Sequence, residues 1–210
     1  MVPHPSFSSP PHRLAALLAL TLACAPGPAP AQDTTAAGLP PAGYGTLRQE
    51  DVAVKLRTGT VQLRVLPLDE RVTRLLAPDS YASLHKLRES MAQAAADAAA
   101  RAGVHAPTLL FVTFFGLQDQ AKFVPDDLTL TSRSRFFRPV AILPISPRWS
   151  EQQLGQRETA SAVYLYEDGI ALFDPFAVSY GGATSTDWEG TLPLLDRERA
   201  AVLARSGGKP

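Results

Sequence analysis

The chain has 210 residues, 45% of them hydrophobic and 19% charged, which is long enough and apolar enough for one globular domain. Lysine plus arginine total 20, and aspartate plus glutamate total 20. This balance argues against a protein that binds nucleic acid through a basic surface. The single cysteine, Cys24, excludes an internal disulfide and any cluster of several thiolate ligands.

The amino-terminal segment has the pattern of a secretory signal. Arg13 precedes an apolar run of ten residues, Leu14 to Ala23, and a bilayer span needs about 20. Ala29-Pro30-Ala31 then offers small residues at alternate positions, so we expect cleavage between Ala31 and Gln32. Residues 1–31 are therefore predicted to be a signal peptide.

Cys24 supports an alternative at the same segment. It follows Thr21-Leu22-Ala23, which resembles a bacterial lipobox except that threonine and leucine stand in the opposite order. Lipidation of Cys24 would make the chain a membrane-tethered lipoprotein with a scaffolding role. With either outcome the domain lies outside the cytoplasm, periplasmic or extracellular, with no transmembrane span in the mature chain.

Residues 32–43 are rich in proline, alanine and glycine and are predicted to be a linker, which leaves 44–210 as a single domain.

The clearest secondary-structure pattern of this domain lies in Asp51–Leu66. With Thr58-Gly59 as a two-residue loop and glycine at positive φ, Leu56 opposes Val61 and Val54 opposes Leu63 on one apolar face. We therefore predict a hairpin with one buried face.

The remaining strands are predicted from alternation and turn residues. Candidates are Thr108–Phe115, Phe123–Thr131, Arg138–Ile145 and a second hairpin around Asp168-Gly169 that pairs Leu165 with Leu172. Both faces of that hairpin are apolar, which indicates that it is central or covered by another element. Pro175 interrupts its second strand, so we expect a bulge or a switch between sheets there. Six to eight short strands predict a mainly β, antiparallel sandwich.

One long helix interrupts the strands, over about residues 80–102. Asp79 or Ser80 is the expected cap, and Gly103 is the expected stop. An apolar stripe with a spacing of three or four residues predicts the buried face: Leu84, Leu87, Met91, Ala94, Ala98 and Ala102. We expect this helix to cover a sheet or an open end of the sandwich. A short helix, Leu195–Arg205, is expected at the carboxyl end.

The segment Phe123-Val124-Pro125-Asp126-Asp127-Leu128-Thr129-Leu130 resembles small secreted bacterial immunoglobulin-like domains of the telokin-like type. In those domains a similar run of aromatic, proline, acid and alternating apolar residues leads into a strand. The resemblance covers about a third of the chain. It implies an immunoglobulin-like sandwich and an envelope location, but it implies no chemistry. The long alanine-rich helix is a departure from that family.

No local pattern identifies a catalytic or metal site. His85 and His105 belong to no paired histidine motif, and the nucleophile elbow, the Walker loop and the dinucleotide loop are all absent from the sequence. No cofactor is expected. A secreted hydrolase is the rival hypothesis. It would require acidic loop residues to converge with His85 or His105, for example His105, Asp126 and Asp187 in one cleft.

Acidic residues in turns are the remaining candidates for chemistry. Asp126-Asp127 and Asp187-Trp188-Glu189 would form a calcium site if their loops converged at one end of a sandwich. The more ordinary interpretation is that these acids occupy solvated turns. In the basic and aromatic stretch Arg133–Arg138, the arginines are interpreted as solvent-exposed positions of a loop that leads into a strand. Trp149 and Trp188 are candidates either for core burial or for partner contact.

The leading hypothesis is an exported, non-enzymatic cell-envelope protein, a module for binding or assembly whose partner the sequence does not identify. It rests on the signal pattern, the two-faced hairpin and the absence of catalytic motifs from the sequence.

Overall fold

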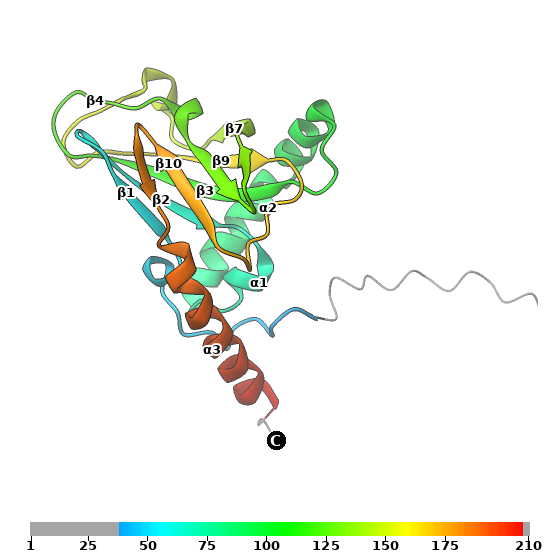
Figure 1. Ribbon diagram of the computed structural model, residues 1–210. Helices are drawn as coiled ribbons and strands as arrows, with labels where there is room; N and C mark the ends of the chain where they lie inside the picture. Colours follow the sequence, from blue (N-terminus) through cyan, green and yellow to red (C-terminus); the bar gives the residue numbers. More distant parts are fainter. Residues whose placement is uncertain (1–37, 208–210) are drawn as a thin grey trace, which may run out of the picture. The chain divides into compact units, whose positions relative to one another are not determined.

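Eleven strands form three antiparallel sheets in residues 38–207, the part of the chain that the computed structural model describes. These residues all fall in the unit Thr35–Pro210, and Figure 1 shows their arrangement. The mainly β, antiparallel class is as predicted. The described residues also contain three α-helices, one more than expected. Four of the strands are only two or three residues long, too short for alternation to reveal them, so the strand count exceeds the expected six to eight.

The largest sheet has five strands. Their order is β1 (Val54–Arg57), β2 (Val61–Pro67), β3 (Thr108–Gly116), β9 (Thr159–Tyr166) and β7 (Pro139–Pro144). A second sheet has the order β11 (Ala183–Ser185), β10 (Phe176–Tyr180), β5 (Thr129–Ser132) and β6 (Arg135–Phe137). Strands β4 (Ala121–Lys122) and β8 (Gln153–Leu154) form a small third sheet.

The first hairpin forms with the predicted buried face but with a different register. Val54 opposes Val65 and Leu56 opposes Leu63, because Thr58 pairs with Val61 and the loop is Gly59-Thr60. Gly59 does not adopt a positive φ, so that part of the prediction was wrong. The shift is two residues, and a two-residue shift leaves every side chain on its predicted face.

The second predicted hairpin was wrong, although a turn does form at Gly169, whose φ is +102°. Strand β9 already has β3 and β7 as neighbours, so no edge remains for residues 170–173 to pair with. The chain instead leaves the five-stranded sheet after Tyr166 and enters the four-stranded sheet at Phe176. The chain thus does switch sheets, as expected near Pro175, although the passage takes up residues 167–175. β9 is an internal strand, but the hairpin that was expected to be central does not form.

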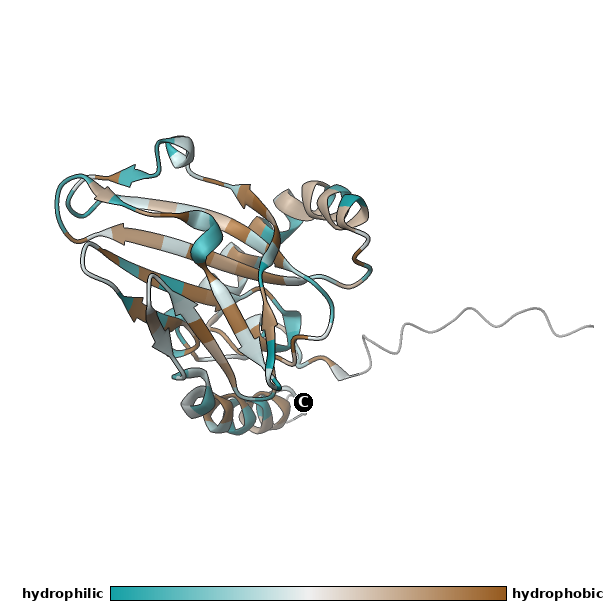
Figure 2. Ribbon diagram, turned by 45° about the horizontal axis from the view of Figure 1, so that its top comes forward, coloured by the Kyte–Doolittle hydropathy of each residue, from teal (hydrophilic) through white to brown (hydrophobic). Residues whose placement is uncertain are grey.

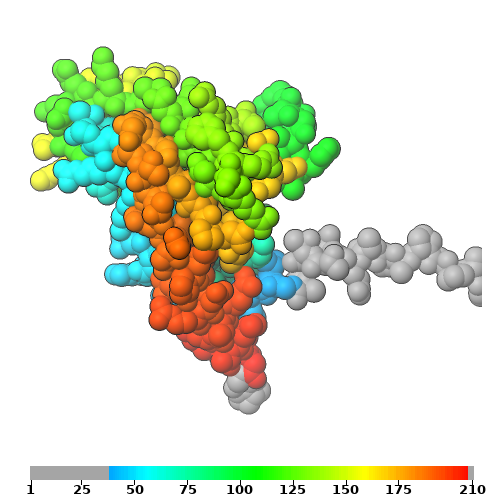
Figure 3. All heavy atoms as spheres, viewed as in Figure 1, coloured from blue at the N-terminus to red at the C-terminus, as the bar shows by residue number. Residues whose placement is uncertain are grey.

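The core lies between these two sheets. The hydroxyls of Tyr164 and Tyr166 donate to the carbonyls of Pro125 and Leu128, at 3.0 and 3.1 Å. Burial raises the pKa of both phenols, so they remain neutral donors. Apolar positions alternate with polar ones along the strands in Figure 2, and Figure 3 shows the side chains of β1, β10 and β5 closing one face together.

Trp149 adds to this core, packing against Phe114 and Phe123 with ring centroids 5.8 and 5.2 Å apart. Trp149 lies in the 3₁₀-helix η4 (Trp149–Glu151), and Pro125 lies in η3 (Pro125–Asp127). Core burial, rather than partner contact, is thus what the structure shows for Trp149 and also for Trp188.

Helix α2 (Pro78–Ala102) covers the outer face of the five-stranded sheet, where it packs against β7 and β9. Since alternate residues of a strand face opposite ways, Val163 and Leu165 point away from Tyr164 and lie on this covered face. The expected end at Gly103 is confirmed by its left-handed conformation. Ala77 stands at the cap and Pro78 begins the helix, so capping by Asp79 or Ser80 was wrong.

The buried positions of α2 are Leu84, Ala95, Ala98 and Ala99. The predicted Ala94 and Ala102 are exposed. A run made almost entirely of alanine gives no contrast between adjacent positions, so periodicity could not distinguish Ala94 from Ala95.

Helix α3 (Trp188–Gly207) begins earlier than predicted and runs through Pro193. Its start is fixed by Trp188, whose Nε1 donates to the carbonyl of Leu172 at 2.8 Å and whose ring packs on Phe176 at 5.0 Å. This packing offsets the hydrogen bond that the proline removes. The short helix α1 (Glu70–Thr73) is capped by Asp69, which accepts from the backbone N–H of Arg71 at 2.8 Å.

Within the described residues, no helix combines the length and the apolarity that crossing a bilayer requires.

Candidate functional site: a cleft beside helix α2

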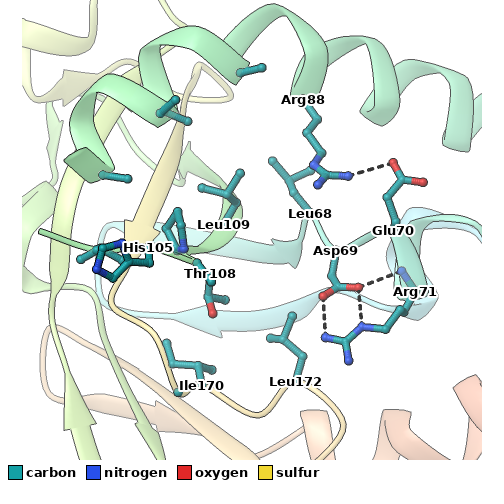
Figure 4. A pocket seen from close by; sticks show the side chains of 18 of the residues that line it. Leu68, Asp69, Glu70, Arg71, Arg88, His105, Thr108, Leu109, Ile170 and Leu172 are labelled. Carbon is teal, nitrogen blue, oxygen red and sulfur yellow. Dashed lines mark hydrogen bonds and ion pairs between the residues drawn. The ribbon is translucent and has the colours of Figure 1, made fainter. Parts of the chain in front are cut away.

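An open cleft of about 1250 Å³ lies beside helix α2 and is shown in Figure 4. The second half of α2 forms one wall. The opposite side is formed by the junction of β2 and α1, by the start of β3 and by the loop after β9. The cleft therefore lies where the long helix meets the end of the five-stranded sheet.

The helical wall is made of alanine. The members that line the cleft follow one face of α2 and are Ala92, Ala95, Ala96, Ala99 and Ala100. Alanine has no side-chain atoms beyond Cβ, so this wall leaves space that longer residues would fill. The apolar side chains that face it are Leu68, Leu109, Val104, Ile170 and Leu172. The surroundings are those of an apolar ligand site.

The loop that supplies Ile170 and Leu172 is held in place by contacts to helices. The carbonyl of Leu172 accepts the bond from Trp188 described above. The next residue, Phe173, has the guanidinium of Arg71 4.7 Å from its ring centroid and that of Arg199 at 5.1 Å. These two cation–π contacts hold Phe173 and with it this side of the cleft.

Charged residues gather at one end of the cleft, around Glu70 (Figure 4). Its Oε2 accepts from Arg74 Nε at 2.6 Å, and its Oε1 accepts from Arg88 Nη1 at 3.0 Å. His85 Nδ1 lies 3.0 Å from the same Oε1, and the Tyr81 hydroxyl lies 3.3 Å from Oε2. Helix α1 supplies the carboxylate and Arg74 follows it directly, while α2 supplies the other partners.

The carboxylate of Glu70 is held in its ionised form. Burial raises the pKa of this carboxyl, but hydrogen bonds from Arg74 and His85 and the positive charge of Arg88 outweigh burial, and the pKa falls below its ordinary value. Beside it, Arg71 makes a two-pronged pair with Asp69, with Nε to Oδ1 at 2.9 Å and Nη2 to Oδ2 at 2.7 Å. Both carboxylates are thus engaged by arginine.

The opposite end of the cleft is formed by the segment after α2. His105 is exposed there and lines the cleft. The backbone N–H of Ala106 donates to Asp168 Oδ1 at 2.9 Å, which ties this segment to the turn after β9. No carboxylate lines the cleft at this end.

Of the candidate catalytic and metal-binding residues named from the sequence, the structure brings only His105 to the cleft. His85 lies just behind it, between Glu70 and Glu89, with Nε2 3.4 Å from Glu89 Oε1. Asp126 and Asp127 are exposed in η3, and Asp187 and Glu189 are exposed at the start of α3.

The cleft lining thus includes neither Asp126 nor Asp187, so the convergence that a hydrolase would need is not seen there. Among the described residues, no three His, Cys, Asp or Glu side chains form a group that would hold a metal ion. The calcium hypothesis for Asp126, Asp127, Asp187 and Glu189 therefore rests on the sequence alone. Cys24, Ala31 and Gln32 lie outside the described residues.

The basic and aromatic stretch forms the turn between β5 and β6 together with β6 itself. Arg133 Nε donates to Asp174 Oδ2 at 2.7 Å, and Arg135 Nη2 lies 3.5 Å from Glu167 Oε1. Arg133, Arg135 and Arg138 are exposed, in the turn, at the first position of β6 and directly after it, in line with their interpretation above.

The sequence reasoning missed Glu70 and Arg88. Two local spacings carried a signal, since Glu70 and Arg74 are four residues apart and so are Tyr81 and His85. Nothing in the sequence showed that these two short patterns meet across α1 and α2.

No family model matches the chain, and neither curated proteins nor solved structures give a significant match.

Proposed function

We propose that this chain is an exported, non-enzymatic binding module whose ligand site is the cleft beside α2. The observation that carries the proposal is an apolar cleft of about 1250 Å³ in which each lining carboxylate is already paired with arginine. General acid–base catalysis needs a titratable group whose pKa lies near the working pH. Glu70 instead has a lowered pKa. This arrangement favours binding over proton transfer.

Export remains part of the proposal and rests on Arg13, the apolar run 14–23 and the small residues before Gln32. The intact mass of the mature protein tests it. Cleavage after Ala31 supports simple secretion, and a diacyl adduct on Cys24 would indicate a lipid-anchored envelope protein instead.

The immunoglobulin-like class also remains a proposal. Two antiparallel sheets that face each other across an aromatic core support a sandwich. Helix α2, inserted between the paired strands β2 and β3, is the main departure from the telokin-like domains that residues 123–130 resemble.

The binding function is tested by filling the cleft. Ala96 lines the cleft, and Ala94, two residues away on the same helix, is exposed and does not. An apolar dye such as Nile red, whose fluorescence rises in apolar surroundings, should bind the protein. Ala96→Trp should weaken that binding about tenfold, because the indole occupies the site. Ala94→Trp is the matched control and should leave it unchanged. Equal binding by both variants would refute the cleft as the ligand site.

A further inference from the structure

One face of α2 carries an arginine at its beginning and alanine along the rest. Arg88, Ala92, Ala96 and Ala99 line the cleft at helical spacing, and Gly103 ends the row. From residue 88 to 103 a helix rises about 22 Å. A ligand that lies along this face meets charge at one end and an apolar wall over the remaining length.

The charged groups that line this end of the cleft balance. The guanidiniums of Arg71 and Arg88 stand against the carboxylates of Asp69 and Glu70. Arg74 and Glu89 both lie outside the lining, Arg74 against Glu70 at 2.6 Å and Glu89 against His85 at 3.4 Å. An anion would therefore be recognised here by hydrogen-bond donors that the carboxylates leave unused.

Arg88 has the donors that an anion would use. Its Nη1 donates to Glu70, and no described residue accepts a hydrogen bond from its Nε or Nη2. The side chain is 43% exposed and lines the cleft. Guanidinium N–H groups in this geometry bind a carboxylate more strongly and more directionally than a neutral donor does.

We propose that the cleft binds a single-chain amphiphile with an anionic head group, such as a long-chain alkyl carboxylate. The head lies at Arg88, and the chain extends along the alanine wall toward His105, against Leu109 and Ile170. This inference rests on the proposed binding function and adds the chemical class of the ligand. The unused guanidinium donors of Arg88 select the head, and the apolar wall selects the chain.

Chain length is the first test. Decanoate, dodecanoate and tetradecanoate are titrated into the protein below their micelle concentrations, with displacement of Nile red or calorimetry as the readout. Each added methylene buried in the cleft should tighten binding about fourfold. Affinity that does not depend on chain length would overturn the proposal.

Head-group charge is the second test. Dodecanoate should bind about tenfold more tightly than dodecanol or dodecyltrimethylammonium, which share its chain but lack its charge. Arg88→Gln should remove this preference while leaving dodecanol binding within about twofold, because the alanine wall is intact. Arg101→Gln, on the same helix but outside the cleft lining, is the matched control. Unchanged dodecanol binding also shows that the variant is folded.

The two proposals fail in different ways. If dodecanol and dodecanoate bind equally and Ala96→Trp blocks both, the cleft is a binding site but the anionic class is wrong. If no amphiphile and no dye binds, the proposed function itself fails. A dimer whose formation Ala96→Trp abolishes would show that a second copy of the chain occupies the cleft and would overturn the amphiphile.

Discussion

The carboxylates of Glu70 and Glu198 are both largely shielded from solvent, with 12% and 9% of their side chains exposed. Glu198, on α3, accepts from Thr46 N at 2.8 Å, from Thr46 Oγ1 at 3.0 Å and from Arg205 Nη1 at 3.0 Å. Arg205 also donates to the carbonyl of Tyr44. These bonds tie the amino-terminal arm, residues 44–47, to the last helix.

Glu70 accepts hydrogen bonds from side chains alone. One of its partners, Arg88, lines the cleft and has N–H groups that donate to no described residue. Glu198 binds a backbone N–H, and its partners close the structure around it. The two carboxylates are buried to a similar extent but are paired differently. Glu198 holds two parts of the chain together through a backbone partner, whereas Glu70 borders the cleft and leaves a cationic partner accessible.

The largest expected effect is at the arm. A Cβ added to Gly45 would stand 2.3 Å from the carbonyl carbon and oxygen of Leu75, which are backbone atoms that cannot move aside easily. Gly45→Ala should lower the free energy of unfolding by about 3 kcal/mol in urea denaturation. Gly59→Ala, where the added atom meets open space, is the control. Equal stability of the two variants would show that the arm does not contribute to the fold.

Glu70→Gln should have the next largest effect. It removes a buried charge that Arg74, Arg88 and His85 share and leaves these groups without their counter-ion. A loss of about 2 kcal/mol in the free energy of unfolding is expected, again from urea denaturation. Glu89→Gln, at a carboxylate that is 67% exposed, should change it by less than about 0.5 kcal/mol. A loss at Glu89 as large as at Glu70 would contradict this account.

Glu198→Gln should cost less, about 1 kcal/mol, because the amide oxygen still accepts the Thr46 bonds and Arg205 is 38% exposed to water. Proteolysis of the arm measures the same contact locally, and cleavage near Tyr44 should become faster in this variant. If cleavage were unchanged, the Glu198 contact would not be what holds the arm.

The smallest effect is the pH dependence of stability that the two carboxylates share. Hydrogen bonds lower the pKa of both below the ordinary value of 4.5. The unfolded chain therefore takes up protons first as the pH falls, and the stabilisation, complete above about pH 4.5, is lost as the pH drops through the folded-state pKa values. Denaturation at pH 7 and pH 3 should show each Gln variant losing less stability than the unaltered chain. Parallel losses in all three proteins would refute the linkage.

Local patterns predicted those parts of the fold that depend on neighbours in sequence. The buried face of 54–65, the strand at Thr108–Phe115 and the helix end at Gly103 follow from alternation or from glycine conformation. The pairing of residues 164–173 could not be predicted in this way, because β9 is paired on both edges by strands distant in sequence. For the site, His105 was recognised but Glu70 was not, since its partners Tyr81, His85 and Arg88 approach it only when α1 packs on α2.

The position of α2 between two paired strands has a consequence for folding kinetics. β2 ends at Pro67 and its partner β3 begins at Thr108, and β3 must then pair with β9, which begins at Thr159. The hairpins β1–β2 and β5–β6 close short loops and should form early, whereas the centre of the large sheet closes long ones. Refolding should therefore be slow, and its yield should fall as protein concentration rises, because β3 and β9 stay unpaired and prone to aggregation in the interval.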